Sequence, residues 1–207
     1  MATPQPPSGH RKKLRHYHTP GDLHELTFSC YQRLKLLTND DWRQRLARCI
    51  DRAGEETGIQ LVAFVFMPEH VHLLVYPTTP EPKIDYYLAR IKQPFSLEIK
   101  ARLEVHRYSL LDRLTVQERP GKKCFRFWQE GAGFDRNLWS SKAIMASIDY
   151  LHNNPVKRRF VDRAIDWKWS SARYFLGNPP RQQHVELPRI YGLPEGALDE
   201  TRSVRPR

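Results

Sequence analysis

One stretch in the middle of the chain constrains the fold more than any other. An apolar run from Ile59 to Met67 is followed by Pro68 and by a second apolar run from Val71 to Tyr76. Apolar runs of this length, separated by a proline, are typical of two buried strands joined by a tight connection. Both runs are too short to span a bilayer. The chain is therefore expected to build a sheet around this hairpin and to cover at least one of its faces.

The segments on either side predict further strands and helices. Apolar and polar residues alternate from Leu26 to Tyr31, which is typical of a strand. A helix is predicted to begin after the capping residue Asn39 and to end at Gly58. A second helix is predicted over Ile84–Leu103, and Pro94 should kink it or end its first half.

The second half of the chain is less regular. Residues 105–123 show no clear period, residues 125–128 alternate as a fourth strand would, and residues 131–137 form a connection or a short fifth strand. A third helix is predicted from Ser140 to about His152, because Pro155 should stop it near Asn153.

This order of elements predicts an α+β fold. Strand, helix, strand, strand, helix, strand and a late helix match a ferredoxin-like antiparallel sheet with helices on one face, plus a C-terminal helix that carries Tyr150. We expect three regions: a basic, partly disordered arm over residues 1–18, the folded domain over residues 19–176, and a Pro/Arg-rich tail over residues 177–207.

The charge of the chain predicts an anionic partner. It has 34 Lys and Arg against 23 Asp and Glu, a formal net charge of +11. A chain this basic usually meets a polyanion, most often nucleic acid, although an anionic membrane surface or an ordinary basic enzyme surface are alternatives.

The three cysteines and the N-terminus predict a compartment. An odd number of cysteines without a CxxC pair argues for a reducing cytoplasm and against a disulfide scaffold or a cysteine zinc site. No apolar stretch follows the N-terminal positive charges, so no secretory signal is expected. We expect a cytoplasmic, nucleoid-associated protein that does not enter a membrane.

A His-Val-His triplet lies at the start of the second apolar run. Side chains alternate faces along a strand, so His70 and His72 point the same way and Val71 points the other way. Two imidazoles on one face of a strand can form half of a site for a divalent cation, or they can be a hydrogen-bonded pair in the core. A second triplet, His16 to His18, lies in the basic arm and is assigned to phosphate contact or to no role.

A second candidate motif lies at the end of the third predicted helix. Tyr150 and Asn154 are spaced i, i+4 and share one face of that helix. Two imidazoles leave a metal under-coordinated, and the Asn154 oxygen can supply a third ligand. Tyr150 would then stand beside the cation, which stabilises a phenolate and polarises a phosphate oxygen. Attack on phosphorus would give a covalent phosphotyrosine. The alternative for Tyr150 is a tyrosine packed by its ring.

These motifs carry a family resemblance. The segment from Phe66 to Leu74 resembles the HUH motif of single-tyrosine transposases of the insertion-sequence type. The segment from Asp149 to Lys157 resembles the catalytic-tyrosine helix of the REP-associated tyrosine transposases, as do Phe127–Gln129, the Gly-rich 131–137 and Trp167–Ser171. The resemblance runs from about Arg15 to Tyr174.

The resemblance implies a metal-dependent nuclease and strand transferase that acts on single-stranded DNA hairpins, typically repetitive extragenic palindromes. It implies that His70 and His72 bind the metal, Mg²⁺ or Mn²⁺, and that Tyr150 is the nucleophile. Insertion-sequence members have a glutamine as third ligand where this chain has Asn154, so Asn153 or a water are alternatives there. A monomer and a homodimer with exchanged tyrosine helices are both compatible with it.

Basic and aromatic residues outside these motifs are candidates for DNA contact. Glu69 could orient a histidine, act as a base or simply form the turn. Trp128, Trp167 and Trp169 could stack on unpaired bases, and core packing is expected for at least two of them. The basic residues expected to contact phosphates are Arg11, Lys12, Lys13, Arg15, Arg90, Lys92, Arg126, Lys157, Arg158 and Arg159.

Two other functions fit parts of this pattern. The chain could be a DNA-binding regulator with the same fold that does not cleave DNA. It could also be an unrelated α+β domain with a structural metal or a core histidine pair. The second alternative predicts that Tyr150 lies far from the two histidines.

Overall fold

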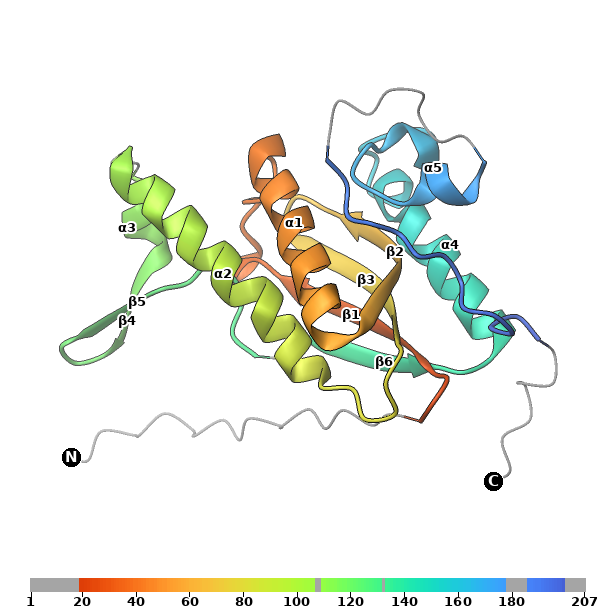
Figure 1. Ribbon diagram of the computed structural model, residues 1–207. Coiled ribbons are helices and arrows are strands. Elements are labelled where there is room, and N and C mark those ends of the chain that lie inside the picture. Colours follow the sequence, from red (N-terminus) through yellow and green to blue (C-terminus); the bar gives the residue numbers. More distant parts are fainter. Residues whose placement is uncertain (1–18, 107–108, 132, 178–185, 200–207) are drawn as a thin grey trace, which may run out of the picture.

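The computed structural model describes residues 19–106, 109–131, 133–177 and 186–199 (Figure 1). Its centre is a four-stranded sheet in the order β2-β3-β1-β6, with antiparallel pairing throughout. The strands are β1 (Leu23–Ser29), β2 (Ile59–Phe66), β3 (His70–Pro77) and β6 (Phe134–Leu138). The predicted α+β fold is confirmed, and β3 is a central strand.

Two helices cover one face of the sheet (Figure 1). Helix α1 (Asp40–Thr57) begins where the Asn39 side chain accepts a hydrogen bond from the Trp42 amide, and it ends at Gly58, which has φ 67°. Helix α2 (Ile84–Val105) continues through Pro94 as one helix, so the proline does not end its first half. Val71, Leu73 and Val75 of β3 are buried under these two helices; Val71 and Leu73 flank His72 in the sequence.

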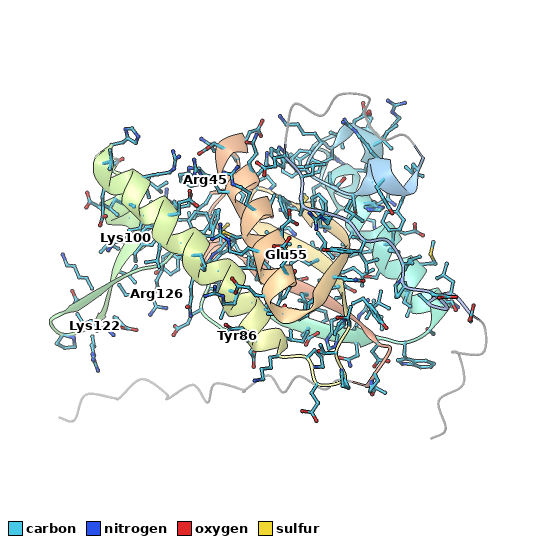
Figure 2. All side chains as sticks on the ribbon, in the orientation of Figure 1. Arg45, Glu55, Tyr86, Lys100, Lys122 and Arg126 are labelled. Carbon is cyan, nitrogen blue, oxygen red and sulfur yellow. The ribbon has the colours of Figure 1, made fainter. Side chains whose placement is uncertain are left out.

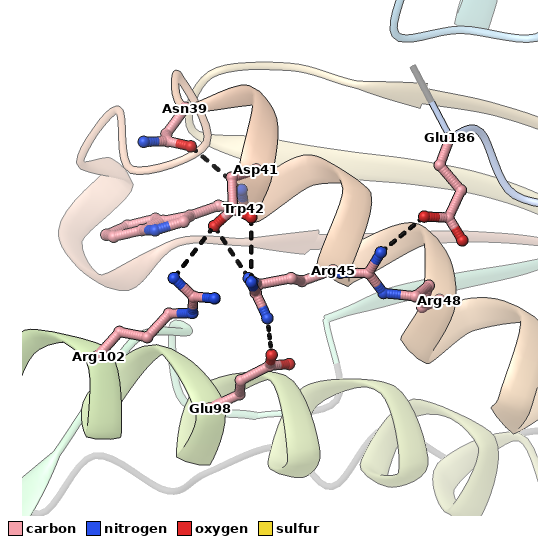
Figure 3. Close-up of polar contacts among 8 residues, drawn as sticks. All are labelled: Asn39, Asp41, Trp42, Arg45, Arg48, Glu98, Arg102 and Glu186. Atoms are coloured by element: carbon pink, nitrogen blue, oxygen red, sulfur yellow. Dashed lines mark hydrogen bonds and ion pairs between the residues drawn. The ribbon is translucent and has the colours of Figure 1, made fainter. Parts of the chain in front are cut away.

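Polar contacts join α1 to α2 at their outer surface (Figure 3). Arg45 of α1 binds Asp41 of its own helix at 2.9 Å and also contacts Glu98 of α2. Arg48 of α1 pairs with Glu186 of the C-terminal segment at 2.6 Å. Exposed ion pairs of this kind contribute about 0–1 kcal/mol each, so buried apolar side chains hold the helices on the sheet.

Helix α4 (Ser141–Lys157) lies on the opposite face of the sheet (Figure 1). The Ser140 side chain accepts a hydrogen bond from the Ala143 amide, which confirms the predicted start of the helix. The apolar side chains that join α4 to the sheet are Ile144, Ile148 and Leu151 on the helix and Val62, Ala63, Val65 and Leu74 on the strands. This face of β3 is the one that carries the two histidines.

The prediction that Pro155 ends this helix near Asn153 is wrong. Helix α4 continues to Lys157 because Pro155 lies in the last turn, where it removes only one backbone donor. The Arg158 amide still donates to the Asn154 carbonyl oxygen at 3.1 Å, and Arg159 with φ 59° turns the chain away. Tyr150, Asn154 and Lys157 therefore lie on one continuous helix.

The fourth strand of the sheet is also not where it was expected. Residues 134–138, the alternative short strand, form β6, whereas residues 125–128 form no strand of this sheet and Trp128 makes an isolated bridge with Cys30. Phe127 and Trp128 are buried in the core, which explains their apolar pattern. Gly133 has φ 88°, and a Cβ there would lie 2.2 Å from the Thr27 carbonyl oxygen, so β6 can begin beside β1 only with glycine at this position.

Residues 105–125 contain structure that periodicity did not reveal. Helix α3 (Leu110–Leu114), strand β4 (Thr115–Arg119) and strand β5 (Lys122–Phe125) form a separate unit that projects from the end of α2 (Figure 1). Among the described strands, β4 and β5 pair only with each other. Most of their side chains are exposed or half-buried, which is why no clear apolar alternation marks them in the sequence.

The segment after α4 packs onto the domain. It includes the short 3-10 helix η2 (Ala164–Asp166) and helix α5 (Ala172–Phe175); a second 3-10 helix, η1 (Tyr31–Arg33), follows β1 instead. The Phe66 amide of β2 donates to the Trp169 carbonyl oxygen at 2.8 Å, and the Tyr191 amide donates to the Leu61 carbonyl oxygen at 2.9 Å. Residues 186–199 contain no helix or strand, in line with the expected lack of regular structure. None of the described helices is long and apolar enough to cross a membrane.

Replacement of a buried residue of α4 should destabilise the domain strongly. Ile148 is 2% exposed, so Ile148→Ala is expected to lower the free energy of unfolding by about 2–4 kcal/mol in urea titrations. Met145 on the same helix is 40% exposed, and Met145→Ala should cost less than about 1 kcal/mol. Equal losses in the two variants would contradict the packing of α4 described above.

Candidate active site

Strand β3 brings the two histidines together on the α4 face of the sheet. The ring centroids of His70 and His72 lie 4.8 Å apart with an angle of 83° between the planes. Each residue is only 5% exposed, and both line a cavity of about 460 Å³. The cavity is lined by Thr27, Ser29, Arg33, His70, His72, Tyr150, Asn154, Lys157 and Arg158.

One nitrogen of each imidazole is held by a neighbouring side chain. His72 Nδ1 lies 2.7 Å from Thr27 Oγ1, and His70 Nδ1 lies 3.0 Å from Glu69 Oε1. Such contacts orient the rings and leave Nε2 as the nitrogen that can bind a ligand. Glu69 thus forms part of the turn between β2 and β3 and also contacts His70.

Burial favours the neutral form of both imidazoles. Burial, with a smaller electrostatic contribution from His70, lowers the pKa of His72 to about 3. Burial also lowers the pKa of His70, although the Glu69 carboxylate acts in the opposite direction. Neutral imidazole is the form that binds metal ions.

Helix α4 places Tyr150 beside this pair. The Tyr150 ring lies 5.6 Å from the His72 ring at an angle of 89°, and the side chain is 43% exposed. Lys157 Nζ lies 5.1 Å from the centre of the Tyr150 ring. Tyr150 also lines an adjacent cavity of about 350 Å³. The alternative of an unrelated α+β domain predicted that Tyr150 lies far from the histidines. That prediction is therefore wrong.

The side chains in this cavity include donors that fit one divalent cation. Among the described residues no group of three His, Cys, Asp or Glu could hold a metal ion, so the histidine pair needs a donor of another kind. Asn154 Nδ2 lies 3.2 Å from His72 Nε2. Rotation of the amide would present its oxygen instead, since the two ends of an amide have the same shape. Two neutral imidazoles and one amide oxygen leave open positions for a substrate oxygen.

An ion pair connects the end of α4 to the histidine strand. Arg158 Nη1 lies 2.6 Å from Glu69 Oε1, and Glu69 is 3% exposed. The same carboxylate oxygen contacts His70 Nδ1. Glu69 therefore orients His70 and holds the C-terminal end of the tyrosine helix at once.

The structure separates the predicted basic residues into two groups. Lys157 and Arg158 line the histidine cavity, and Arg159 is exposed next to them. Arg90, Lys92 and Arg126 do not line it. Arg11, Lys12, Lys13, Arg15 and the His16–His18 triplet lie outside the described residues.

The second group lies around α2. Arg90 pairs with Glu56 of α1 at 2.5 Å. Lys92 and Arg126 line a different cavity of about 750 Å³ between α2 and the β5 region, and Arg126 pairs with Glu130 at 2.8 Å. Figure 2 shows Arg126 below α2, on the far side of the molecule from α4.

The three tryptophans mainly serve the core. Trp128 is 7% exposed and Trp169 is 1% exposed, which confirms core packing for two of the three. Trp167 is half-buried, and its Nε1 donates to the Phe66 carbonyl oxygen at 3.1 Å. Arg43 lies between Trp167 and Trp169, 5.3 Å and 5.4 Å from their ring centres.

Sequence reasoning missed the contribution of β1. Thr27 pairs with His72 and Ser29 with His70 in the register of β1 against β3, so both line the cavity. Their alternation with apolar residues placed them on a common polar face, but only the pairing shows which residues they meet. Arg33, just after β1, gave no signal in the sequence.

Acid should destabilise the fold through buried histidines. Burial lowers the pKa of His152 from 6.5 to about 4, and the pKa of His72 and that of His70 are also lowered. The unfolded chain binds protons first as pH falls below 6.5, so each such histidine should remove up to about 1.4 kcal/mol of unfolding free energy per pH unit until its folded pKa is reached.

Urea titrations between pH 7 and pH 4.5 measure this loss. Above about pH 6.5 the histidine contribution is fully present and the curve should be flat. His152→Gln should make the slope below pH 6.5 shallower, because one titrating group is gone. Equal stability at pH 7 and pH 4.5 would contradict the burial of these neutral imidazoles.

Comparisons with known proteins show which class of protein this chain resembles. Residues 23–117 match the protein family described as Transposase IS200 like, and this segment includes β1, β3 and both histidines. A solved structure of a REP-associated tyrosine transposase bound to a REP hairpin has the same fold, with a TM-score of 0.61 and 19% identity. That match covers 89% of this chain and 98% of the other.

A second match is to a relative with a more specific name. A protein of Haemophilus influenzae (strain ATCC 51907 / DSM 11121 / KW20 / Rd), provisionally named a REP-associated tyrosine transposase, is 25% identical over 153 residues. The match covers 74% of this chain and 81% of the relative. Together these matches confirm the resemblance to the REP-associated tyrosine transposases, and the chain has their fold.

Proposed function

We propose that this protein is a metal-dependent endonuclease and strand transferase for single-stranded DNA hairpins, with Tyr150 as the nucleophile. The observation that carries the proposal is the common cavity of His70, His72, Tyr150 and Asn154. The structural neighbour is bound to a REP hairpin, so a palindromic hairpin of that kind is the proposed substrate. The formal net charge of this chain, +11, supports a polyanionic partner.

His70, His72 and Asn154 would hold the cation, proposed to be Mg²⁺ or Mn²⁺. When bound, the cation supplies charge that polarises a phosphate oxygen and stabilises a phenolate. Thr27 and Glu69 keep the imidazoles oriented through their Nδ1 atoms.

Tyr150 would carry out the bond exchange. The Tyr150 phenolate oxygen forms a bond to phosphorus while the bond from phosphorus to one deoxyribose oxygen breaks, and that oxygen leaves and takes up a proton. Lys157, whose Nζ lies 5.1 Å from the centre of the Tyr150 ring, would place a positive charge beside the attacked phosphodiester. The phosphotyrosine conserves the phosphodiester energy, so a DNA hydroxyl can later attack it and restore a DNA strand.

A covalent-adduct assay tests the proposal. Purified protein is mixed with labelled single-stranded DNA that contains a palindromic hairpin and its flanks, with Mg²⁺, with Mn²⁺ or with a chelator. A labelled protein–DNA band that needs metal and disappears on protease treatment is expected. Hairpin binding without such a band would support the non-cleaving DNA-binding regulator instead.

A further inference from the structure

The turn that follows β1 has a rare backbone conformation beside the cavity. Gln32 has φ 50° and Arg33 has φ 53°, in the left-handed region that residues with a Cβ seldom adopt. The turn is held from outside, because the Tyr31 amide donates to the Phe127 carbonyl oxygen at 2.8 Å and the Gln32 amide donates to Gln129 Oε1 at 3.1 Å. Strained turns held in this way are often found at functional sites.

The same turn is attached to the histidine strand. The Cys30 amide donates to the Glu69 carbonyl oxygen at 2.8 Å, and Ser29 pairs with His70 in the sheet. The Arg33 amide in turn donates to the Cys30 carbonyl oxygen at 3.0 Å. The position of Arg33 at the cavity is therefore fixed relative to the imidazoles.

The guanidinium of Arg33 forms no ion pair within the described part of the chain. Three cationic residues line the histidine cavity: Arg33, Lys157 and Arg158. Arg158 is neutralised by Glu69 at 2.6 Å, whereas Arg33 has no carboxylate or other side-chain partner among the described residues. An exposed guanidinium at the wall of a cavity, on a fixed backbone and without a counter-charge, is available for an anionic ligand.

We propose that Arg33 is a further catalytic residue, which binds a non-bridging oxygen of the phosphodiester that Tyr150 attacks. This inference rests on the proposed function. As the bond from Tyr150 to phosphorus forms and the bond to the leaving oxygen breaks, negative charge is spread over the non-bridging oxygens. A guanidinium can donate two parallel hydrogen bonds to such a group, which a lysine cannot do.

The conformation of the turn allows the guanidinium to be removed without a change in the backbone. Glycine adopts a φ near 53° without strain, so Arg33→Gly removes the guanidinium and keeps the turn. Gln32→Gly, at φ 50°, is the matched control for backbone freedom. Adduct formation under single-turnover conditions should be roughly 10²–10³-fold slower in Arg33→Gly and within about threefold of the original rate in Gln32→Gly.

Two further measurements separate charge stabilisation from a structural effect. The thermal midpoint of Arg33→Gly should equal or exceed that of the original protein. With a neutral methylphosphonate at the cleaved position, the difference in rate between the original protein and Arg33→Gly should shrink at least about tenfold, because less charge needs stabilisation. Arg33→Lys should restore only part of the rate.

Several outcomes would overturn the assignment. Arg33→Gly with an adduct rate within threefold of the original would exclude a phosphate contact by Arg33. An equal loss in Gln32→Gly, or a rate difference unchanged with methylphosphonate DNA, would assign the effect to the turn. Failure of the original protein to form any adduct would instead refute the proposed function itself, and this inference with it.

Discussion

Tyr150→Phe is expected to abolish the covalent protein–DNA adduct and to slow strand cleavage by roughly 10⁴-fold or more, which is the scale on which loss of a nucleophile acts in other enzymes. The substitution deletes one hydroxyl and keeps the ring, which lies 5.6 Å from the His72 ring and below Lys157. The side chain is 43% exposed, so no buried hydrogen bond is lost and stability should stay within about 0.5 kcal/mol.

The experiment compares adduct formation, cleavage and hairpin affinity in three proteins. The control is Tyr86→Phe, because Tyr86 is 50% exposed on α2, on the other side of the sheet (Figure 2). Tyr86→Phe should behave like the original protein, and Tyr150→Phe should keep its affinity for the hairpin within about twofold. Cleavage that survives in Tyr150→Phe would refute the nucleophile assignment.

His72→Ala is expected to reduce the affinity for Mn²⁺ by more than about 100-fold. Loss of a residue that only orients a ligand typically costs 10–100-fold in metal affinity, and loss of the ligand itself should exceed that range. His72 lies at the centre of the proposed donor set, with Thr27 at 2.7 Å on one side and Asn154 at 3.2 Å on the other. Isothermal titration with Mn²⁺ measures the change without requiring any DNA cleavage.

A second buried histidine provides the control for this titration. His152 also lies on α4, with its Nε2 2.7 Å from Ser171 Oγ, and it does not line the cavity. His152→Gln should therefore leave Mn²⁺ affinity within about threefold of the original. If His72→Ala and His152→Gln bind Mn²⁺ equally well, the histidine pair is not the metal site. Thermal midpoints recorded for both variants would show whether either one unfolds.

Much of the site could be predicted because its two halves are each encoded locally. The alternation of side chains along a strand is enough to place His70 and His72 on one face, and the helical repeat is enough to place Tyr150 and Asn154 on another. Helix ends set by Asn39, Gly58 and Ser140 follow from capping chemistry that involves only adjacent residues.

Other features depend on residues that are far apart in the sequence. Helix α4 continues past Pro155, and the fourth strand is formed by residues 134–138, beside β1. Phe127 and Trp128 have the apolar pattern of a strand, yet their side chains fill the core beside α2. The local sequence pattern cannot tell which segment forms a strand of the sheet, because the residue preference at a strand position depends on the side chains that pack against it.

The sequence by itself determined the α+β order of elements, the shared face of the two histidines and the spacing of Tyr150 to Asn154, since each depends on periodicity within a few residues. Only the tertiary structure decided that these faces meet in one cavity, that Thr27 and Glu69 hold the imidazoles, and that Arg33 stands beside them with no side-chain partner among the described residues. The physical reason is strand register: the pairing of β1 with β3 is set by packing over the whole sheet, and a shift of one residue in β1 would turn Thr27 and Ser29 away from the histidines to the other face.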